Sequence, residues 1–416
     1  MKYPKLAEKT RNRWIVVAGA LLVQLCLGAI YSWSVFVKPL IDDYSYTATQ
    51  TQAVFSVALA SFAVTMIFAG RWQDKKGPRV VATAGGIVLC VGYLLAYFTG
   101  GSFTGLVLTV GVVGGAGIGL AYVCPIASCV KWFPDKRGMV SGLAVAGFGA
   151  GAWIFAKISA TFIDSYGLMS TFLYLGLIFL ASVVLGAQLL VNPPYGYKPA
   201  GWNPPEKNSK KNSEDFEWRD MLATRQFWML WVMFVFGAAA GLMVIGILKP
   251  FGAQQMQEAG GLAEDVAKAT AVSAVGVLAL FNGAGRIVWG AASDRIGRTK
   301  AMGLMFLLQG AMMLYLTNMG TTKLSLAVAA AWVGFNFGGN FALFPSATAD
   351  YFGTRNVGIN YGLVFTSYGV AGIAGPLLGG RVFDATGSYT WAFIPAGIAC
   401  IIAAALSFKL KHPHNG

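Results

Sequence analysis

Long apolar stretches alternate with short polar ones along the whole chain. Each apolar stretch has about twenty residues, which is enough for an α-helix to cross a hydrocarbon layer of about 30 Å. The pattern predicts twelve transmembrane helices, at 14–37, 50–70, 79–99, 104–128, 138–163 and 169–191, and then at 225–248, 266–290, 299–318, 322–345, 358–381 and 389–408. We therefore expect an all-α membrane protein that lies in the lipid bilayer.

One polar segment is much longer than the others. It runs from Asn192 to Thr224, and its Pro, Asn, Lys and Glu residues cannot form a buried core. This segment separates six predicted helices from the next six. We expect an N-terminal six-helix bundle over 1–191, a linker over 192–224 and a C-terminal six-helix bundle over 225–416.

The two halves repeat short motifs at a constant spacing. "GRWQDKKGPR" begins at Gly70, and "GAASDRIGRTK" begins at Gly290, 220 residues later. The same spacing pairs Asp74 with Asp294. Because several matches share one spacing and fall in equivalent positions between helices, the chain is an internal duplication. Duplicated membrane proteins of this kind are typically transporters, with the substrate site between the halves.

The repeated motif leads to a known family. The pattern G-x-x-x-D-[RK]-x-G-x-[RK] resembles the loop motif of the major facilitator superfamily, which implies two pseudo-symmetric six-helix halves. Four further motifs resemble the oxalate/formate antiporters and the related monocarboxylate transporters: "YSW" from Tyr31, "KWFPDKRGMVSGL" from Lys131, "FNGAGR" from Phe281 and "ALFPS" from Ala342. The resemblance is strongest to a bacterial monocarboxylate (lactate-type) transporter.

Charge and composition set the orientation and exclude several functions. Only 12% of the 416 residues are charged, and the net charge is +14. Most of the cations gather in alternate loops, so the positive-inside rule places both termini in the cytoplasm of a cell membrane, here the bacterial inner membrane. This clustering between spans argues against a nucleic-acid partner. The five cysteines show no metal-ligand spacing, and we expect neither a metal nor a cofactor.

A single arginine interrupts the apolar run "FNGAGRIVWG". Arg286 is the one charged residue between Ala269 and Ser293, and burying such a cation in lipid costs roughly 2.5–3.5 kcal/mol or more. The duplication places Met66 opposite Arg286, so the arginine is not part of the repeated framework. Asn282, four residues earlier, shares its helix face. No Asp or Glu lies within any predicted span.

We interpret Arg286 as the binding site for a substrate carboxylate, because a guanidinium offers two parallel donors to that group. Two other interpretations stay open: Arg286 can reach the membrane interface or bond backbone carbonyls, and Asn282 can simply bridge helices. The family resemblance adds that a second cation of the oxalate/formate antiporters corresponds here to Tyr368. One cation suits a monoanion, since a dianion would keep an unpaired, desolvated charge.

The resemblance also implies the rest of the binding site. Aromatic residues at matching positions would form its wall, although each can equally be an ordinary packing residue; they are Tyr31, Tyr122, Phe337, Phe341, Phe365 and Tyr368. Charged residues of the loops and the first span would act in gating or coupling, unless they are merely solvated; they are Lys38, Asp74, Asp294 and Arg295.

Together these features predict a secondary active transporter that works by alternating access, as a monomer. The expected substrate is a small monocarboxylate such as L-lactate or pyruvate, moved with a proton. Animal relatives carry an aspartate at the position of Asn282, which cannot titrate, so the proton carrier is not identified. An oxalate/formate-type anion antiporter is the alternative. An enzyme is not expected, because no span holds a histidine or carboxylate for catalysis.

Overall fold

A computed structural model describes residues 12–194, 196–199, 201–202, 215–258, 261–386 and 388–413. All regular secondary structure in these ranges is helical. The first eleven residues and part of the predicted linker, mainly 203–214, lie outside the described residues.

The N-terminal half contains eight α-helices. They are α1 (Arg13–Leu27), α2 (Ser34–Tyr44), α3 (Ala48–Lys76), α4 (Pro78–Phe98), α5 (Phe103–Leu106), α6 (Gly115–Trp132), α7 (Arg137–Tyr166) and α8 (Leu168–Leu189). Two of the predicted spans are less regular than expected. A 3₁₀ segment (Gly28–Ser32) separates α1 from α2, and a π-helical segment (Val107–Gly114) joins α5 to α6.

The C-terminal half follows a similar order. Its helices are α9 (Trp218–Ala223), α10 (Arg225–Glu258), α11 (Glu264–Ile296), α12 (Arg298–Tyr315), α13 (Lys323–Phe352), α14 (Val357–Thr386) and α15 (Thr390–Lys409). Every predicted span thus has a helical counterpart. Within the described ranges, eleven helical stretches are long and apolar enough to cross a membrane; α12 is not among them, since Arg298 and Lys300 lie in its first turn.

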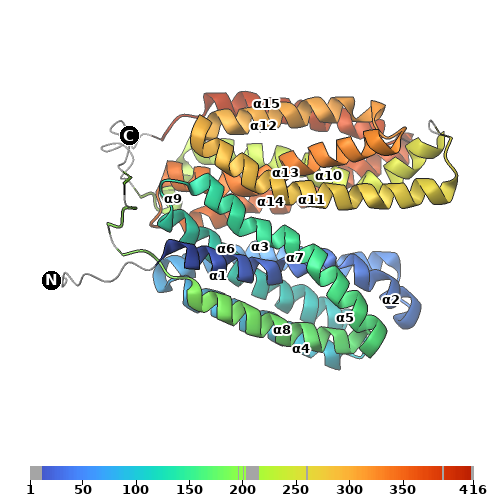
Figure 1. The fold of residues 1–416 in the computed structure, drawn as a ribbon, viewed down its shortest axis with the longest axis horizontal. Helices are drawn as coiled ribbons and strands as arrows, with labels where there is room; N and C mark the ends of the chain where they lie inside the picture. The colour runs from blue at the N-terminus through green and yellow to red at the C-terminus, as the bar shows by residue number, and fades with distance from the viewer. Residues whose placement is uncertain are drawn as a thin grey trace.

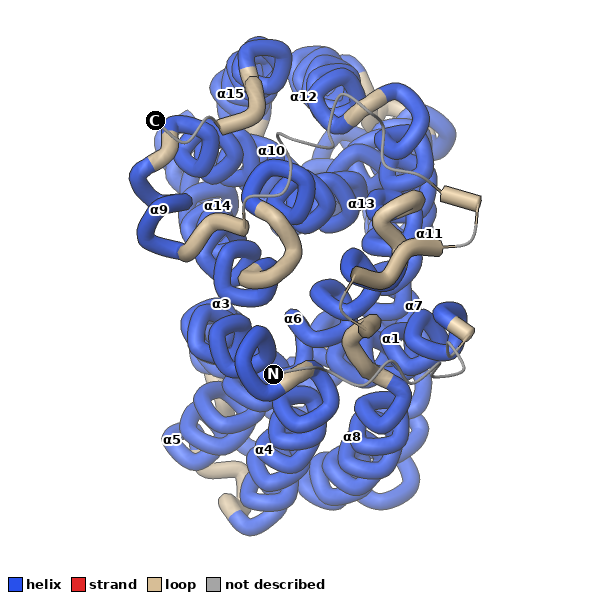
Figure 2. Tube along the Cα trace, turned by 90° about the vertical axis from the view of Figure 1, so that its left-hand side faces the viewer, coloured by secondary structure: helices blue, strands red, loops and turns tan. Residues whose placement is uncertain are grey.

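The helices form two bundles that lie side by side, α1–α8 in one and α10–α15 in the other (Figure 1). Contacts between the bundles run mainly along two pairs of helices. The helix α7 packs on α11, and α3 packs on α14. Figure 2 looks along the bundles and shows α3 and α7 on one side of the boundary and α14 and α11 on the other. The start of α1 and the end of α15 lie at the same end as α9 (Figure 1).

Repeated sequence produces repeated local structure at this end. Gly77 ends α3 and Gly297 ends α11, with φ of 87° and 92°, a left-handed conformation that glycine adopts without strain. The next helix starts at once in both cases. We call this end of the bundle, where α3 and α11 end and α7 and α14 begin, the charged end.

Candidate functional site

Arg286 lies on α11 at the boundary between the two bundles and is 1% exposed. Its Nε donates a hydrogen bond to Oδ1 of Asn282 at 2.9 Å, and its Nη1 donates to the carbonyl oxygen of Val145 on α7 at 2.6 Å. Its guanidinium carbon lies 4.4 Å from the centre of the Phe341 ring. The cation is therefore held by one amide, one backbone carbonyl and one aromatic face.

Neutral groups hold a charged side chain here. Among the described residues no carboxylate forms an ion pair with Arg286. A backbone carbonyl is a weaker partner for guanidinium than a carboxylate, because it carries only a partial charge. In this conformation Arg286 therefore bonds a backbone carbonyl, which was one of the alternatives that the sequence left open.

The six aromatic residues implied by the resemblance all lie near Arg286, in one chain of ring contacts. Phe341 contacts both Phe337 and Tyr368, at 5.3 and 5.5 Å between ring centres. Tyr368 stacks on Phe365 at 5.0 Å, and Phe365 reaches Tyr122 across the boundary at 5.5 Å. The wall thus contains residues of both bundles. Phe62 and Phe148, which the sequence did not single out, complete it beside Tyr122.

Tyr31 closes the chain of aromatic contacts. Its hydroxyl lies 2.6 Å from the hydroxyl of Tyr368, so one hydrogen bond joins the two bundles. Arg286 lies four residues from Gly290, which touches Gly138, and Tyr368 lies ten residues from Gly358, which touches Gly70 in the equivalent place. At 1.5 Å per residue these positions are roughly 6 and 15 Å from the two glycine contacts. The tyrosine pair therefore lies beyond Arg286, on the side away from the charged end.

Close helix contact seals the other side of Arg286. Gly142 of α7 lies against the backbone of Arg286, and a side chain at Gly142 would overlap the Arg286 carbonyl. Nearer the charged end Gly138 and Gly290 touch in the same way. In the opposite direction the helices separate: a side chain at Gly149 would meet only the Cα of Gly283, at 3.9 Å. The bundles are thus closed at the charged end and diverge toward the other end.

The two repeated aspartates join the bundles at the charged end. Asp294 accepts hydrogen bonds from the backbone N–H groups of Gly138 and Met139, both at 2.8 Å. Asp74 accepts from Gly358 and Ile359, at 3.1 and 2.9 Å. Each carboxylate therefore satisfies free N–H groups at the first turn of a helix in the other bundle, where the helix dipole also favours an anion.

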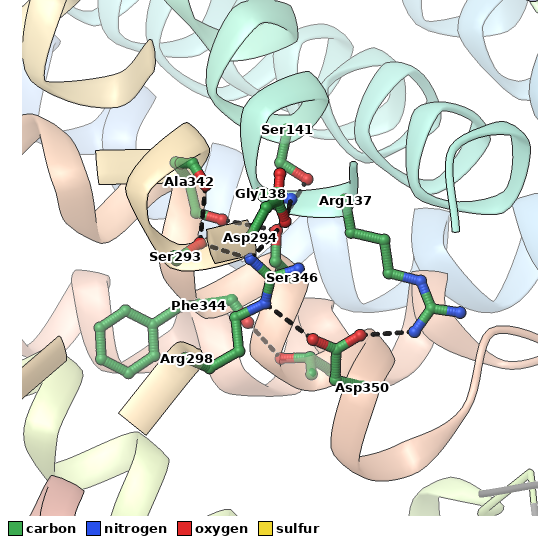
Figure 3. Close-up of polar contacts among 12 residues, drawn as sticks. Arg137, Gly138, Ser141, Ser293, Asp294, Arg298, Ala342, Phe344, Ser346 and Asp350 are labelled. Carbon is green, nitrogen blue, oxygen red and sulfur yellow. Dashed lines mark hydrogen bonds and ion pairs between the residues drawn. The ribbon is translucent and has the colours of Figure 1, made fainter. Parts of the chain in front are cut away.

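A larger set of charges surrounds Asp294 (Figure 3). Arg298 lies between two carboxylates and contacts both Asp294 and Asp350 at 2.7 Å. Arg137, at the start of α7, reaches the same Asp350 from the other bundle. Arg298 also donates to the hydroxyl of Ser293. Arg137, Asp294, Arg298 and Asp350 form what we call the ionic cluster.

The sequence prediction for the charged end was incomplete. Arg295, which the sequence suggested for gating, is exposed and has no ion pair with any described residue. Arg298, the first residue of α12, contacts Asp294 and Asp350 instead, across the turn at Gly297. Asp350 and Arg137 were also missed; both lie at helix ends, where a charge normally faces water. The side chain of Lys38 lies outside the described residues.

Comparison with known proteins agrees with this architecture. The sequence profile of the Major Facilitator Superfamily matches residues 17–264 and 243–416. The oxalate:formate antiporter of Oxalobacter formigenes is 30% identical over 418 residues, which cover 98% of this chain and 94% of that protein. Monocarboxylate transporter 13 of Rattus norvegicus is 24% identical over 406 residues, with 96% and 89% coverage. The crystal structure of the transporter FucP in the outward conformation matches with a TM-score of 0.69 at 15% identity, covering 95% of this chain and 99% of that one.

The chain therefore belongs to the Major Facilitator Superfamily. It is a multi-pass membrane protein and a transporter rather than an enzyme, and the predicted fold class and family resemblance are confirmed. Its relatives include carriers of small organic anions.

Proposed function

We propose that this protein carries small monocarboxylates such as L-lactate or pyruvate across the membrane by alternating access, with Arg286 binding the carboxylate. The observation that carries the proposal is the environment of Arg286. The guanidinium is buried at the boundary of the two bundles, bonded to Asn282 and the Val145 carbonyl. No described carboxylate pairs with it, so a substrate anion would supply the missing charge.

The surroundings of Arg286 favour a monoanion. Tyr368, which faces the same region from α14, offers a hydroxyl and no charge. A second carboxylate on the substrate would enter a site walled by Phe341 and Phe365, with no described cation to pair with it. Such an unpaired charge is expensive in a low-dielectric site. The oxalate/formate-type exchange of the first relative is the alternative within the same class.

Alternating access requires contacts that can break on each side of Arg286. The ionic cluster and the two aspartate caps hold the charged end closed, and we place that end in the cytoplasm because the chain concentrates its cations there. The tyrosine pair closes the other side with a single hydrogen bond. Opening toward the outside would then break far fewer contacts than opening toward the cytoplasm.

Coupling to a proton belongs to the proposal but has less support. Asn282 contacts Arg286 and does not titrate, and the substrate carboxylate or Lys38 is left to carry the proton. Anion exchange needs no such carrier. We keep proton symport as the first hypothesis and exchange as the second, for a protein that works as a monomer.

Uptake of labelled L-lactate into proteoliposomes tests the proposal. An inward proton gradient should accelerate uptake several-fold, and unlabelled pyruvate should compete better than oxalate. Uptake that ignores the gradient but is accelerated by internal anion would establish exchange instead. If oxalate competed as well as pyruvate, the monocarboxylate assignment would be wrong.

A further inference from the structure

Tyr361 has a buried hydroxyl that no described group satisfies. The residue lies in the first turns of α14 and is 1% exposed. Its hydroxyl has no hydrogen-bond partner among the described residues. Leaving a buried donor unpaired costs roughly 1–3 kcal/mol. A phenylalanine would fill the same space without that cost, so the hydroxyl calls for an explanation.

In the other half of the repeat, the hydroxyl that corresponds to Tyr361 does have a hydrogen-bond partner. Ser141 on α7 precedes Tyr361 by the repeat spacing of 220 residues, and its hydroxyl accepts a hydrogen bond from Ser346 of α13 at 3.1 Å. The residue that corresponds to Ser346 is Ile126 on α6, which has no polar group. The framework therefore provides a partner for the serine in one half and none for the tyrosine in the other.

Tyr361 lies nearer the charged end than Phe365 and Tyr368 do. It precedes Phe365 and Tyr368 by four and seven residues, so all three share one face of α14. The ring centres of Tyr361 and Phe365 are 5.8 Å apart. Four residues place Tyr361 about 6 Å nearer the charged end than Phe365.

We propose that the Tyr361 hydroxyl is a second hydrogen-bond donor for the transported carboxylate, used when the charged end opens. This inference rests on the proposed function. In the present state the bundles meet on that side of Arg286 and the hydroxyl is unpaired. When they part, a carboxylate that leaves Arg286 toward the charged end passes Tyr361 and satisfies it. The residue then raises affinity for substrate at the charged-end face alone.

The test measures L-lactate transport from each face separately, in right-side-out and inside-out membrane vesicles. Tyr361→Phe should raise KM about fivefold or more at the charged-end face, as expected for one lost hydrogen bond to a charged group. At the opposite face KM should stay within about twofold. Tyr93→Phe is the matched control, because it removes a buried phenol in the N-terminal bundle, among Phe172 and Phe179. It should leave both values unchanged.

A substrate-free measurement supplies a second, independent readout. Spin labels at the exposed positions Lys76 and Lys300 would report the separation of the bundles at the charged end, and the native cysteines are all buried. Because Tyr361→Phe removes an unpaired hydroxyl from the closed state, the ratio of closed to open molecules should increase about fivefold or more.

The outcomes separate this inference from the proposed function. An equal change of KM at both faces, or no change at either, would overturn the role of Tyr361 while transport through Arg286 stands. An unchanged closed-to-open ratio would overturn it too. If the wild-type protein moved no lactate from either face, the proposed function would fail, and this inference would fail with it.

Discussion

The charged end contains two junctions between the bundles that the duplication makes equivalent, and they differ in chemistry. At one junction Asp294 of α11 caps α7, and at the other Asp74 of α3 caps α14. A pair of glycines lies beside each cap, Gly290 with Gly138 and Gly70 with Gly358. Backbone geometry is thus the same at both places.

The surroundings of the two caps are not the same. The α7–α11 junction contains the ionic cluster, in which Arg298 and Arg137 share Asp350. At the other junction the residues corresponding to Asp350 and Arg137 are Val130 and Val357, which pack together in a small apolar cluster. There Lys131 is the cation that accompanies Asp74, at 3.5 Å.

The difference continues one turn further into the membrane. Gly142 packs on the backbone of Arg286, and its counterpart Gly362 packs on Met66 in the same way. Met66 is completely buried and apolar. The duplicated framework therefore brings the helices together, and the residues that break the repeat supply charge. Arg286 lies on α11, and the unrepeated charges Arg298 and Asp350 lie on α12 and α13, so most of the residues that break the repeat belong to the C-terminal bundle.

Replacing Arg286 with the residue found in the other half gives the largest expected effect. Arg286→Met should lower lactate uptake by at least about 100-fold, because loss of a charge-assisted bidentate contact corresponds to roughly 3 kcal/mol. The protein should still fold, since methionine already occupies the equivalent packing position. Uptake in proteoliposomes and elution as a single species in detergent would measure the two properties.

The matched change is Met66→Leu on α3, which keeps a buried apolar side chain at the position whose backbone contacts Gly362. Its uptake should remain within about threefold of wild type, as for a volume-conserving core substitution. Normal transport by Arg286→Met would remove the basis of the comparison, because the unrepeated charge would then have no role.

Sequence patterns predicted the framework well because they depend on what is repeated. The helical spans follow from hydrophobic length, and Asp74 and Asp294 follow from the repeated loops. Arg286 was found by the opposite signal, a cation without a counterpart. The six aromatic positions came from family resemblance, and in the structure they form one contiguous chain. Phe62 and Phe148 belong to the same chain, but the sequence did not distinguish these two from the many other aromatic residues.

Contacts between distant segments could not be predicted in this way. Asp350 and Arg137 are 213 residues apart, and each reads in the sequence as a solvated charge at a helix end. Arg295 was expected to act in gating with the repeated aspartate that it follows, whereas the ion pair with Asp294 is made by Arg298, the first residue of α12. Tyr361 was missed because it is distinguished by a hydroxyl without a hydrogen-bond partner among the described residues, and hydrogen-bond partners can be identified only in the structure.

The two aspartate caps should differ in importance. Asp294→Asn loses an ion pair with Arg298 at 2.7 Å besides weakening two cap hydrogen bonds, whereas Asp74→Asn loses a longer contact with Lys131 at 3.5 Å. We expect transport to fall about tenfold for Asp294→Asn and about threefold for Asp74→Asn, corresponding to roughly 1.4 and 0.7 kcal/mol. Initial uptake rates at saturating lactate would measure both. Equal losses would show that the helix caps, which the junctions share, dominate over the charges.

The ionic cluster can be converted to the apolar form of the other junction. Asp350→Val alone should lower thermal stability, because it leaves Arg137 and Arg298 without one carboxylate, at a cost of about 1–3 kcal/mol. Adding Arg137→Val recreates the valine pair of the α3–α14 junction and should recover part of that loss. Thermal unfolding in detergent of Asp350→Val, Arg137→Val and the double variant gives the coupling energy between the two residues. Additive effects would mean that the two side chains do not interact.

The smallest effect is expected where the junctions look alike in sequence and in structure. Lys75 and Arg295 each follow the repeated aspartate, and both are exposed, with no ion pair to any described residue. Substituting either by alanine should change stability by less than about 0.5 kcal/mol, as for surface residues in general, and leave uptake within about twofold. Thermal unfolding and lactate uptake of the two variants, compared with Arg298→Ala, would check this. A strong loss for Arg295→Ala but not for Lys75→Ala would restore the gating role that the sequence suggested. It would also mean that Arg295 finds a partner in a conformation with the charged end open.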